Sequence, residues 1–323
     1  MVKERRICVP LKDKKEGERV VDFYLIRERD ISIAANGSEY MTFILGKGQQ
    51  LTRGRLWDVS DEQKKSFHKR SVVKVDGIVT VFRNQKHLNI QRIRLATEKD
   101  AVDIAELIGK PTVPREEMWH ELRLMIEEID SSSLKQIIKT LLGDKNVRDR
   151  FTTLPASKYL HHSHYAGLLE HTVTVCQAAL HLLPLYPQLN KDVILSAAIL
   201  HDIGMVKALS DPLAPDYTMS GELVGHLYLS CEMINHAAYQ AGISVEDAEL
   251  LSVKHCIISH RDKSNIGEGS PVLAKTAEAL FLQGLIQINR QLQAVQSATK
   301  SSEELWVYSP LLNRDVMVGN DDK

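Results

Sequence analysis

Hydrophobic and polar residues alternate along the first third of the chain with a period close to two, the spacing of β-strands. Turn signals such as Ala35-Asn36-Gly37 and Gly46-Lys47-Gly48 separate the alternating segments. The expected strands are residues 20–26, 39–45, 51–57, 71–81 and 86–93, and a short polar helix is expected over 61–68. Five strands with a helix between the third and the fourth form the arrangement of an OB-fold barrel, which commonly binds single-stranded nucleic acid.

The pattern changes to a helical period after an acidic linker, residues 98–114, which ends in Pro111 and Pro114. The expected helices are residues 115–129, 132–142, 165–183, 191–203, 222–240, 245–259 and 271–296. From about residue 300 the chain becomes polar toward its end, and we expect it to be loosely structured. The fold class predicted is multidomain α+β, with a five-stranded barrel followed by an all-α domain.

Charge is distributed unevenly along the chain. Residues 1–97 hold 21 Lys and Arg against 12 Asp and Glu, whereas the remaining 226 residues hold 20 against 30. A basic barrel is expected to attract phosphate backbones, with an ordinary soluble surface as the alternative.

Several barrel residues could contact a nucleic-acid strand. The candidates are Arg53, Arg55, Arg83 and Lys86 for phosphates, and Tyr40 and Trp57 for stacking on bases. The basic residues could instead be a solvated surface. Among the aromatic residues, Phe43 is expected in the barrel core, while Tyr40 and Trp57 fit either role.

The composition of the chain indicates the compartment in which the protein is expected. With 43% hydrophobic and 26% charged residues, the chain has an ordinary globular composition. It has no apolar run approaching the roughly 20 residues of a membrane helix, so no membrane association is expected. Its charged start predicts no secretory signal, and four scattered cysteines without a CxxC pair fit a reducing compartment. We therefore expect a cytoplasmic protein.

The dipeptide His201-Asp202 is the strongest chemical signal in the second part of the chain. It follows the apolar segment 193–200, and Gly204 follows it, so the end of one helix presents an imidazole beside a carboxylate. This ligand chemistry suits divalent manganese, iron, cobalt or zinc, and we favour manganese. His171 can share the ion only if its helix packs against that of His201.

Further histidines fit the same centre. His226 follows Gly225, and His255 and His260 are five residues apart, so at most one of that pair is expected in the site; we favour His260. The predicted metal ligands are His171, His201, Asp202, His226 and His260. Asp202, His260 and Arg261 are predicted to be catalytic, with Arg261 holding phosphate and His260 holding phosphate or a second ion.

These residues give the sequence a resemblance to a known family. The chain resembles the YhaM-type 3′–5′ exoribonucleases, which join an OB-fold to an HD domain, from about Val20 to Gln291. The segments that carry the resemblance are Ala34-Ala35-Asn36-Gly37, Leu56-Trp57-Asp58-Val59-Ser60, Pro114-Arg115-Glu116-Glu117-Met118, His161-His162, Gly167-Leu168-Leu169-Glu170-His171, Leu200-His201-Asp202-Ile203-Gly204, Gly225-His226, Ser259-His260 and Gly269-Ser270-Pro271.

The resemblance implies metal-dependent removal of nucleotides from RNA 3′ ends, some activity on single-stranded DNA, and assembly into homo-oligomers. It also implies a division of the chain into regions. They are an N-terminal extension (1–18), an OB-fold nucleic-acid-binding domain (19–97), a linker (98–114), a helical pair (115–150), an HD metal-dependent phosphohydrolase-like domain (151–299) and a C-terminal tail (300–323).

The sequence departs from the family pattern at three positions around the expected centre. No Asp occurs between Asp262 and Asp315, where the family places its last ligand; Met205 replaces a Lys, and Arg261 replaces a His. Glu278 and Lys207 are the nearest residues that could compensate. The hypothesis of phosphodiester hydrolysis therefore has two alternatives. One is a catalytically impaired, oligomeric protein that binds single-stranded nucleic acid, and the other is an HD phosphohydrolase acting on small nucleotides.

Overall fold

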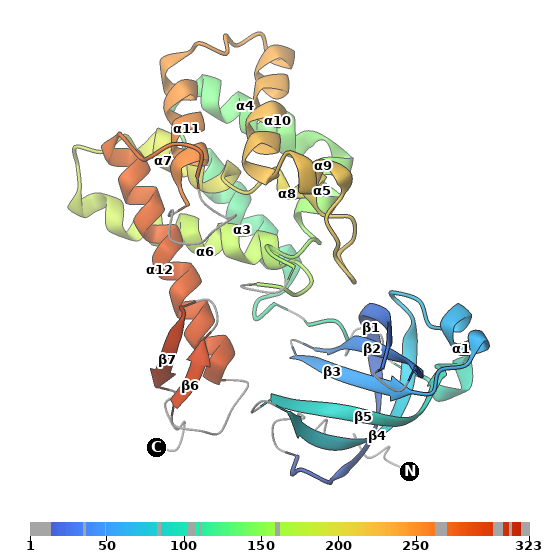
Figure 1. The fold of residues 1–323 in the computed structure, drawn as a ribbon. Helices are drawn as coiled ribbons and strands as arrows, with labels where there is room; N and C mark the ends of the chain where they lie inside the picture. The colour runs from blue at the N-terminus through green and yellow to red at the C-terminus, as the bar shows by residue number, and fades with distance from the viewer. Residues whose placement is uncertain are drawn as a thin grey trace, which may run out of the picture. The chain divides into compact units, whose positions relative to one another are not determined.

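The computed structural model describes residues 14–34, 37–48, 50–82, 85–102, 107–109, 111–158, 162–261, 270–299, 306–309 and 312–317. The chain forms two compact units, residues 1–110 with 297–323, and residues 111–296 (Figure 1). Among the described residues, no helix is both long and apolar enough to cross a membrane.

The first unit contains the expected five-stranded barrel. Its strands are β1 (Arg19–Ile33), β2 (Glu39–Lys47), β3 (Gln50–Trp57), β4 (Val72–Phe82) and β5 (Gln85–Leu95), and α1 (Asp61–Ser66) connects β3 to β4. The strands close in the order β1-β2-β3-β5-β4, with β3 and β5 parallel and the other pairs antiparallel. The prediction of a five-stranded OB-type barrel is confirmed.

Alternation along each strand separates the barrel core from its surface. On β3, Thr52, Gly54 and Leu56 are buried, whereas Arg53 and Arg55 between them are exposed. Phe43 on β2 is 1% exposed and belongs to the core, as its pattern predicts. Successive side chains of a strand point to opposite faces, so Arg53, Arg55 and Trp57 on β3 fall on the outer face.

The second unit is helical. Its helices are α3 (Arg115–Glu127), α4 (Ser132–Gly143), α5 (Lys145–Phe151), α6 (Gly167–Leu182), α7 (Lys191–Leu200), α8 (Met205–Ala208), α9 (Met219–Leu223), α10 (His226–Gln240), α11 (Ala248–Ser259) and α12 (Ala277–Thr299). Short 3₁₀ turns lie at η2 (Glu98–Asp100), in the first unit, and η3 (Leu183–Leu185), in the second. The prediction of an all-α domain after the barrel is confirmed.

Helix α7 is the centre of this unit. Every residue from Val193 to Leu200 is buried, because an apolar helix without a polar face is stable only when other helices surround it. Helices α4, α6 and α11 pack against it (Figure 1). The first polar residues after this buried segment are His201 and Asp202, so the packing carries them into the interior of the unit.

Two local expectations were wrong. The predicted helix over 222–240 is broken at Val224–Gly225 into α9 and α10. The segment expected to be loose after residue 300 contains two antiparallel strands, β6 (Trp306–Ser309) and β7 (Arg314–Met317). Trp306, Val307 and Tyr308 favour extended backbone, and Asn313 turns the chain with a φ of 49°.

Candidate metal centre

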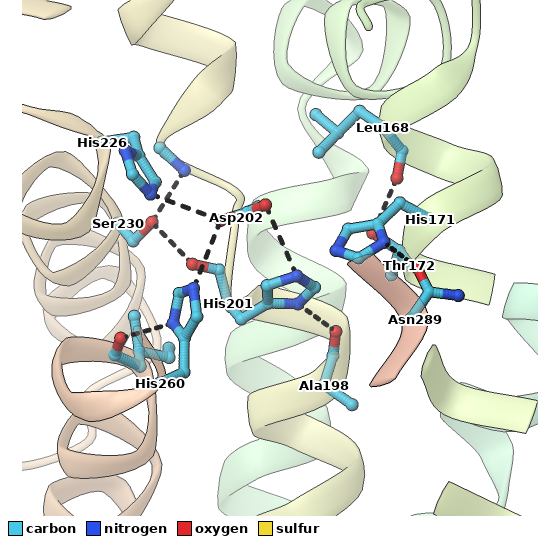
Figure 2. A network of polar contacts seen from close by, with 12 residues as sticks. Leu168, His171, Thr172, Ala198, His201, Asp202, His226, Ser230, His260 and Asn289 are labelled. Carbon is cyan, nitrogen blue, oxygen red and sulfur yellow. Dashed lines mark hydrogen bonds and ion pairs between the residues drawn. The ribbon is translucent and has the colours of Figure 1, made fainter. Parts of the chain in front are cut away.

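Asp202 lies at the centre of a cluster of imidazole rings. Its Oδ2 is 3.5 Å from Nε2 of His201, and its Oδ1 is 3.4 Å from Nε2 of His226 and 3.8 Å from Nε2 of His260. His171 completes the cluster, because its ligand atom and those of His201 and Asp202 all lie within 4.8 Å of one another. Figure 2 shows these side chains pointing toward one another from α6, α10 and the ends of α7 and α11.

The cluster has an orderly arrangement of ring nitrogens. Nδ1 of His201 donates a hydrogen bond to the Ala198 carbonyl at 2.8 Å, and Nδ1 of His260 donates to that of Ile257 at 2.7 Å (Figure 2). Since a neutral imidazole carries one N–H, a ring that donates through Nδ1 offers a lone pair at Nε2. These Nε2 atoms are the ones that face Asp202.

The polar atoms of the cluster test whether it fits a cation. Nε2 of His201, Nε2 of His226 and Oδ1 of Asp202 are buried and have no hydrogen-bond partner among the described residues. Leaving buried polar atoms in this state costs about 1–3 kcal/mol each. Two ligands bound at about 2.1 Å to one ion lie about 3–3.5 Å apart, close to the observed separations. The cluster therefore fits a divalent ion held by nitrogen and oxygen ligands.

Electrostatics keep these groups in the protonation states that metal binding needs. Burial alone raises the pKa of Asp202, but its charge interactions with His201, His226, Arg261 and His260 outweigh that effect and hold the pKa well below its usual value. Burial and the nearby Arg261 lower the pKa of His226 to about 4, and burial lowers that of His260 well below its usual value. At neutral pH Asp202 is therefore ionised, and His226 and His260 beside it are neutral.

The backbone brings the helices close enough for this cluster to form. An added Cβ at Gly204 would lie 2.1 Å from the carbonyl oxygen of His226 and 2.6 Å from the amide nitrogen of Ser230. The Ser230 hydroxyl accepts a hydrogen bond from the Gly204 amide at 2.9 Å and donates to the His201 carbonyl at 3.4 Å. The glycine after the His-Asp pair is thus needed for the close approach of α10.

Sequence reasoning did not assign a role to Asn289, which the structure places in the cluster. Its Oδ1 accepts a hydrogen bond from Nδ1 of His171 at 2.8 Å, so Nε2 of His171 is left to face the centre (Figure 2). Arg290, the next residue, was also missed; its charge contributes to lowering the pKa of His226. No local motif distinguishes either residue. Both reach the site only because α12 packs beside it in the folded protein.

The residues considered as compensation lie elsewhere. Lys207 donates to Glu232 at 3.1 Å on the surface, and Glu278 accepts from the Asn190 amide at 3.2 Å near the start of α7. Of His255 and His260, at most one was expected in the site, and His260 is the one that lies beside Asp202. Nε2 of His255 instead accepts a hydrogen bond from the Lys275 amide at 2.9 Å. Neither Lys207 nor Glu278 takes the place of a missing group.

On the barrel, three of the nucleic-acid candidates form one cluster. The rings of Tyr40 and Trp57 are paired across β2 and β3, with centroids 4.9 Å apart, and the Arg55 guanidinium lies 5.1 Å from each centroid. Trp57 is 42% exposed, so the cluster offers an aromatic surface to solvent. The fourth residue, Arg53, is exposed and lies two positions before Arg55 on β3.

Lys86 does not join that cluster. Lys86 is exposed, but it is two residues from buried Leu88 on β5. Side chains two residues apart on a strand point to the same face, so Lys86 lies on the opposite face of β5 from His87. Arg83 lies outside the described residues. His87, which sequence reasoning did not single out, pairs in register with Arg53; burial, then Arg53 and Arg55, lower its pKa.

A five-stranded OB-type barrel followed by a helical unit whose central helix ends in a buried His-Asp pair defines a protein of the HD class. The family model described as HD domain matches residues 168–292. The protein named 3′–5′ exoribonuclease YhaM from Geobacillus sp. (strain WCH70) is 35% identical over 264 residues, which cover 82% of this chain and 80% of that protein. The chain belongs to the family of this exoribonuclease, which confirms the resemblance found in its sequence.

Two solved structures share only a low similarity with this chain. Asparaginyl-tRNA synthetase of Entamoeba histolytica is 12% identical with a TM-score of 0.22, covering 45% of this chain and 34% of that one. Aspartyl-tRNA synthetase of the same organism is 11% identical with a TM-score of 0.22, covering 55% and 36%. Neither likeness bears on the function.

Proposed function

We propose that this protein is a metal-dependent 3′–5′ exoribonuclease that hydrolyses the phosphodiester bonds of single-stranded RNA. The observation that carries the proposal is the convergence of four histidines on the buried carboxylate of Asp202. These histidines are His171, His201, His226 and His260. The relative's name supplies the reaction class, and the donor chemistry of the site supports it.

The ligand residues have distinct parts in this proposal. His171, His201 and Asp202 would hold one divalent ion, and His226 and His260 approach the same carboxylate from its other side. A bound divalent ion supplies Lewis-acid activation of water and offsets phosphate charge. We favour manganese because the donors are imidazole and carboxylate without thiolate.

The surrounding residues prepare the site for a phosphate. The carbonyls of Ala198 and Ile257 and the amide of Asn289 orient three rings through their Nδ1 atoms. Arg261 follows His260 directly, and its charge acts on both Asp202 and His226, so it can pair with a phosphate oxygen. Burial of the cluster strengthens each of these interactions.

The barrel is proposed to bind the single strand. Tyr40 and Trp57 offer ring faces on which bases can stack, and Arg53 and Arg55 place positive charge beside them. This combination recognises the backbone and base faces and needs no particular base order. A mononucleotide gains little from such a surface, which argues against a small nucleotide as the substrate.

Hydrolysis can be tested with a 5′-labelled single-stranded RNA and added Mn²⁺. We expect a ladder of products shortened one nucleotide at a time from the 3′ end, and loss of that ladder in Asp202→Asn. The matched control is Asp149→Asn, because Asp149 is an exposed carboxylate of the same helical unit. A ladder that survives in Asp202→Asn would contradict the assignment of the centre. A parallel arm with single-stranded DNA measures strand preference.

One observation favours a second candidate function. His171 is supported by the amide of Asn289, and no Asp occurs between Asp262 and Asp315, where the family pattern places its last carboxylate, so the centre holds less negative charge. The alternative is a catalytically impaired HD protein that binds single-stranded nucleic acid as an oligomer. RNA binding without shortening in Mn²⁺, Co²⁺, Fe²⁺ or Zn²⁺ would support this alternative over hydrolysis.

We also propose a homo-oligomer in the cytoplasm. Exposed apolar residues on α12 support assembly, namely Leu280, Ile288 and Leu292, which are 58%, 55% and 65% exposed. They lie eight and four residues apart, on one side of the helix, and a second copy could cover them. Light scattering after gel filtration tests the assembly.

The free thiols of Cys176, Cys231 and Cys256 agree with a reducing compartment.

A further inference from the structure

Next to the metal centre lies a second group of ligand-type side chains, His162, His164 and Glu170. Oε2 of Glu170 is 2.8 Å from Nδ1 of His162 and 2.9 Å from Nε2 of His164. The two histidines are 5% and 8% exposed, and Glu170 is in the first turn of α6. Its other oxygen, Oε1, accepts a hydrogen bond from the Thr112 amide at 3.1 Å.

The bonding of His164 requires a positive charge at this point. Nδ1 of His164 donates to the Tyr165 carbonyl at 3.0 Å, so a neutral ring directs a lone pair from Nε2 at a carboxylate oxygen. Two acceptors 2.9 Å apart repel unless a proton or a metal cation lies between them.

The distances and donor set fit a metal cation. Ligands at right angles around an ion with bonds of about 2.1 Å lie about 3.0 Å apart, close to both nitrogen–oxygen distances seen here. Two imidazoles and one carboxylate form the ligand set that proteins use for divalent first-row transition ions with open positions. Magnesium and calcium prefer oxygen ligands and fit this group poorly.

The loop that carries the two histidines is held in place by its backbone. The Ala156 amide donates to the His162 carbonyl at 3.1 Å, and the Ala166 amide donates to that of Thr153 at 2.9 Å. An added Cβ at Gly167 would lie 2.0 Å from the carbonyl oxygen of His162. His162 and Ala166 have left-handed φ values of 46° and 59°, a conformation that costs about 1–3 kcal/mol per residue and occurs often at ligand sites.

We propose that His162, His164 and Glu170 bind a divalent first-row transition cation separately from the centre around Asp202. The cation fastens the loop at 162–167 to the first turn of α6. His171 follows Glu170 on that turn, and its ring centroid is 5.4 Å from that of His162. Occupancy of this second site therefore positions one ligand of the first. The proposal concerns metal binding and is independent of whether the protein hydrolyses RNA.

The test measures bound metal in a protein whose first centre is disabled. Asp202→Asn protein is saturated with Co²⁺, freed of excess ion by gel filtration, and analysed for metal per chain and for the visible absorption of bound Co²⁺. We expect about one ion to remain, and we expect His164→Gln in the same background to remove it. The matched control is His181→Gln, since His181 lies on the surface of α6, the helix of Glu170, and donates to the Gln177 carbonyl one turn earlier.

Equal metal content with and without His164→Gln would overturn the proposal and leave a protonated His164 as the source of the charge. If His164→Gln protein does not fold, as judged by circular dichroism, Glu170→Gln replaces it. A third readout needs no substitution at the cluster: the midpoint of thermal unfolding of Asp202→Asn is expected to rise with added Co²⁺. No rise counts against the site. Loss of one ion on His164→Gln, together with no nuclease activity in the protein that retains Asp202, would support this inference while contradicting hydrolysis.

Discussion

Nδ1 of His171 donates a hydrogen bond to Oδ1 of Asn289 at 2.8 Å, joining residues 118 positions apart on α6 and α12. The amide orients the ring but brings no charge. A carboxylate at the same place would orient the ring in the same way and would also offset part of the charge of an ion. The side chain at position 289 is therefore expected to set the strength of metal binding.

Asn289→Asp should strengthen Mn²⁺ binding by about 10-fold or more, the size of effect produced by changing groups that support metal ligands. Isothermal titration with Mn²⁺ measures the affinity. Asn235→Asp, which alters an amide on α10 paired with Lys254, is the control and should leave the affinity unchanged. An equal or weaker affinity in Asn289→Asp would contradict the proposed arrangement.

Gly204→Ala should destabilise the helical unit by about 1–3 kcal/mol or more, because the new methyl group meets the backbone of α10 rather than a movable side chain. Urea unfolding followed by circular dichroism measures the change. Gly284→Ala is the matched substitution, since nothing lies within 4 Å of its added Cβ on α12, and it should stabilise by about 0.5–1 kcal/mol. Similar effects at both positions would show that the close approach is unimportant.

Trp57→Ala should weaken binding of single-stranded RNA by about 1–3 kcal/mol, the contribution of one stacked base. Fluorescence anisotropy of a labelled RNA at fixed salt measures the affinity. Tyr239→Ala serves for comparison, because Tyr239 is an 82% exposed aromatic residue on α10. The stacking role of the barrel fails if the two substitutions have the same effect.

Acid should destabilise the metal-free protein. Burial lowers the pKa of His226 from 6.5 to about 4. Between these pH values the unfolded chain binds a proton that the folded protein excludes, so the free energy of unfolding falls as pH falls. The contribution of His226 to this loss over the whole interval is about 3 kcal/mol. Urea unfolding in EDTA at several pH values measures it, and His226→Gln should reduce the slope. An unchanged slope would exclude His226 as its source.

Much of the fold could be predicted because its signals are local. Alternation in segments such as residues 51–57 indicates a strand without reference to any distant residue, and the apolar segment 193–200 indicates a buried helix. The split at Val224–Gly225 and the strands after residue 300 were missed. The first depends on how α9 and α10 pack, and the second on a pairing that neither short strand predicts alone.

The site residues could be predicted only where the ligand side chains lie within a few residues of one another in the sequence. His201 and Asp202 are adjacent in the sequence, so their pairing could be predicted from it. Asn289 and Arg290 were missed because helical α12 shows no pattern that distinguishes them before it packs. The group of His162, His164 and Glu170 was also missed, since nothing in the spacing shows that Glu170 turns toward the loop and away from His171.

The sequence by itself determined the barrel, the helical second unit and the His-Asp pair at the end of its central helix, because periodicity and short motifs act over neighbouring residues. Tertiary structure alone decided which of thirteen histidines meet, that an amide supports His171, and that two further histidines share a carboxylate. Those contacts join side chains on helices and loops far apart in the chain, and only the packing of the apolar core brings them within bonding distance.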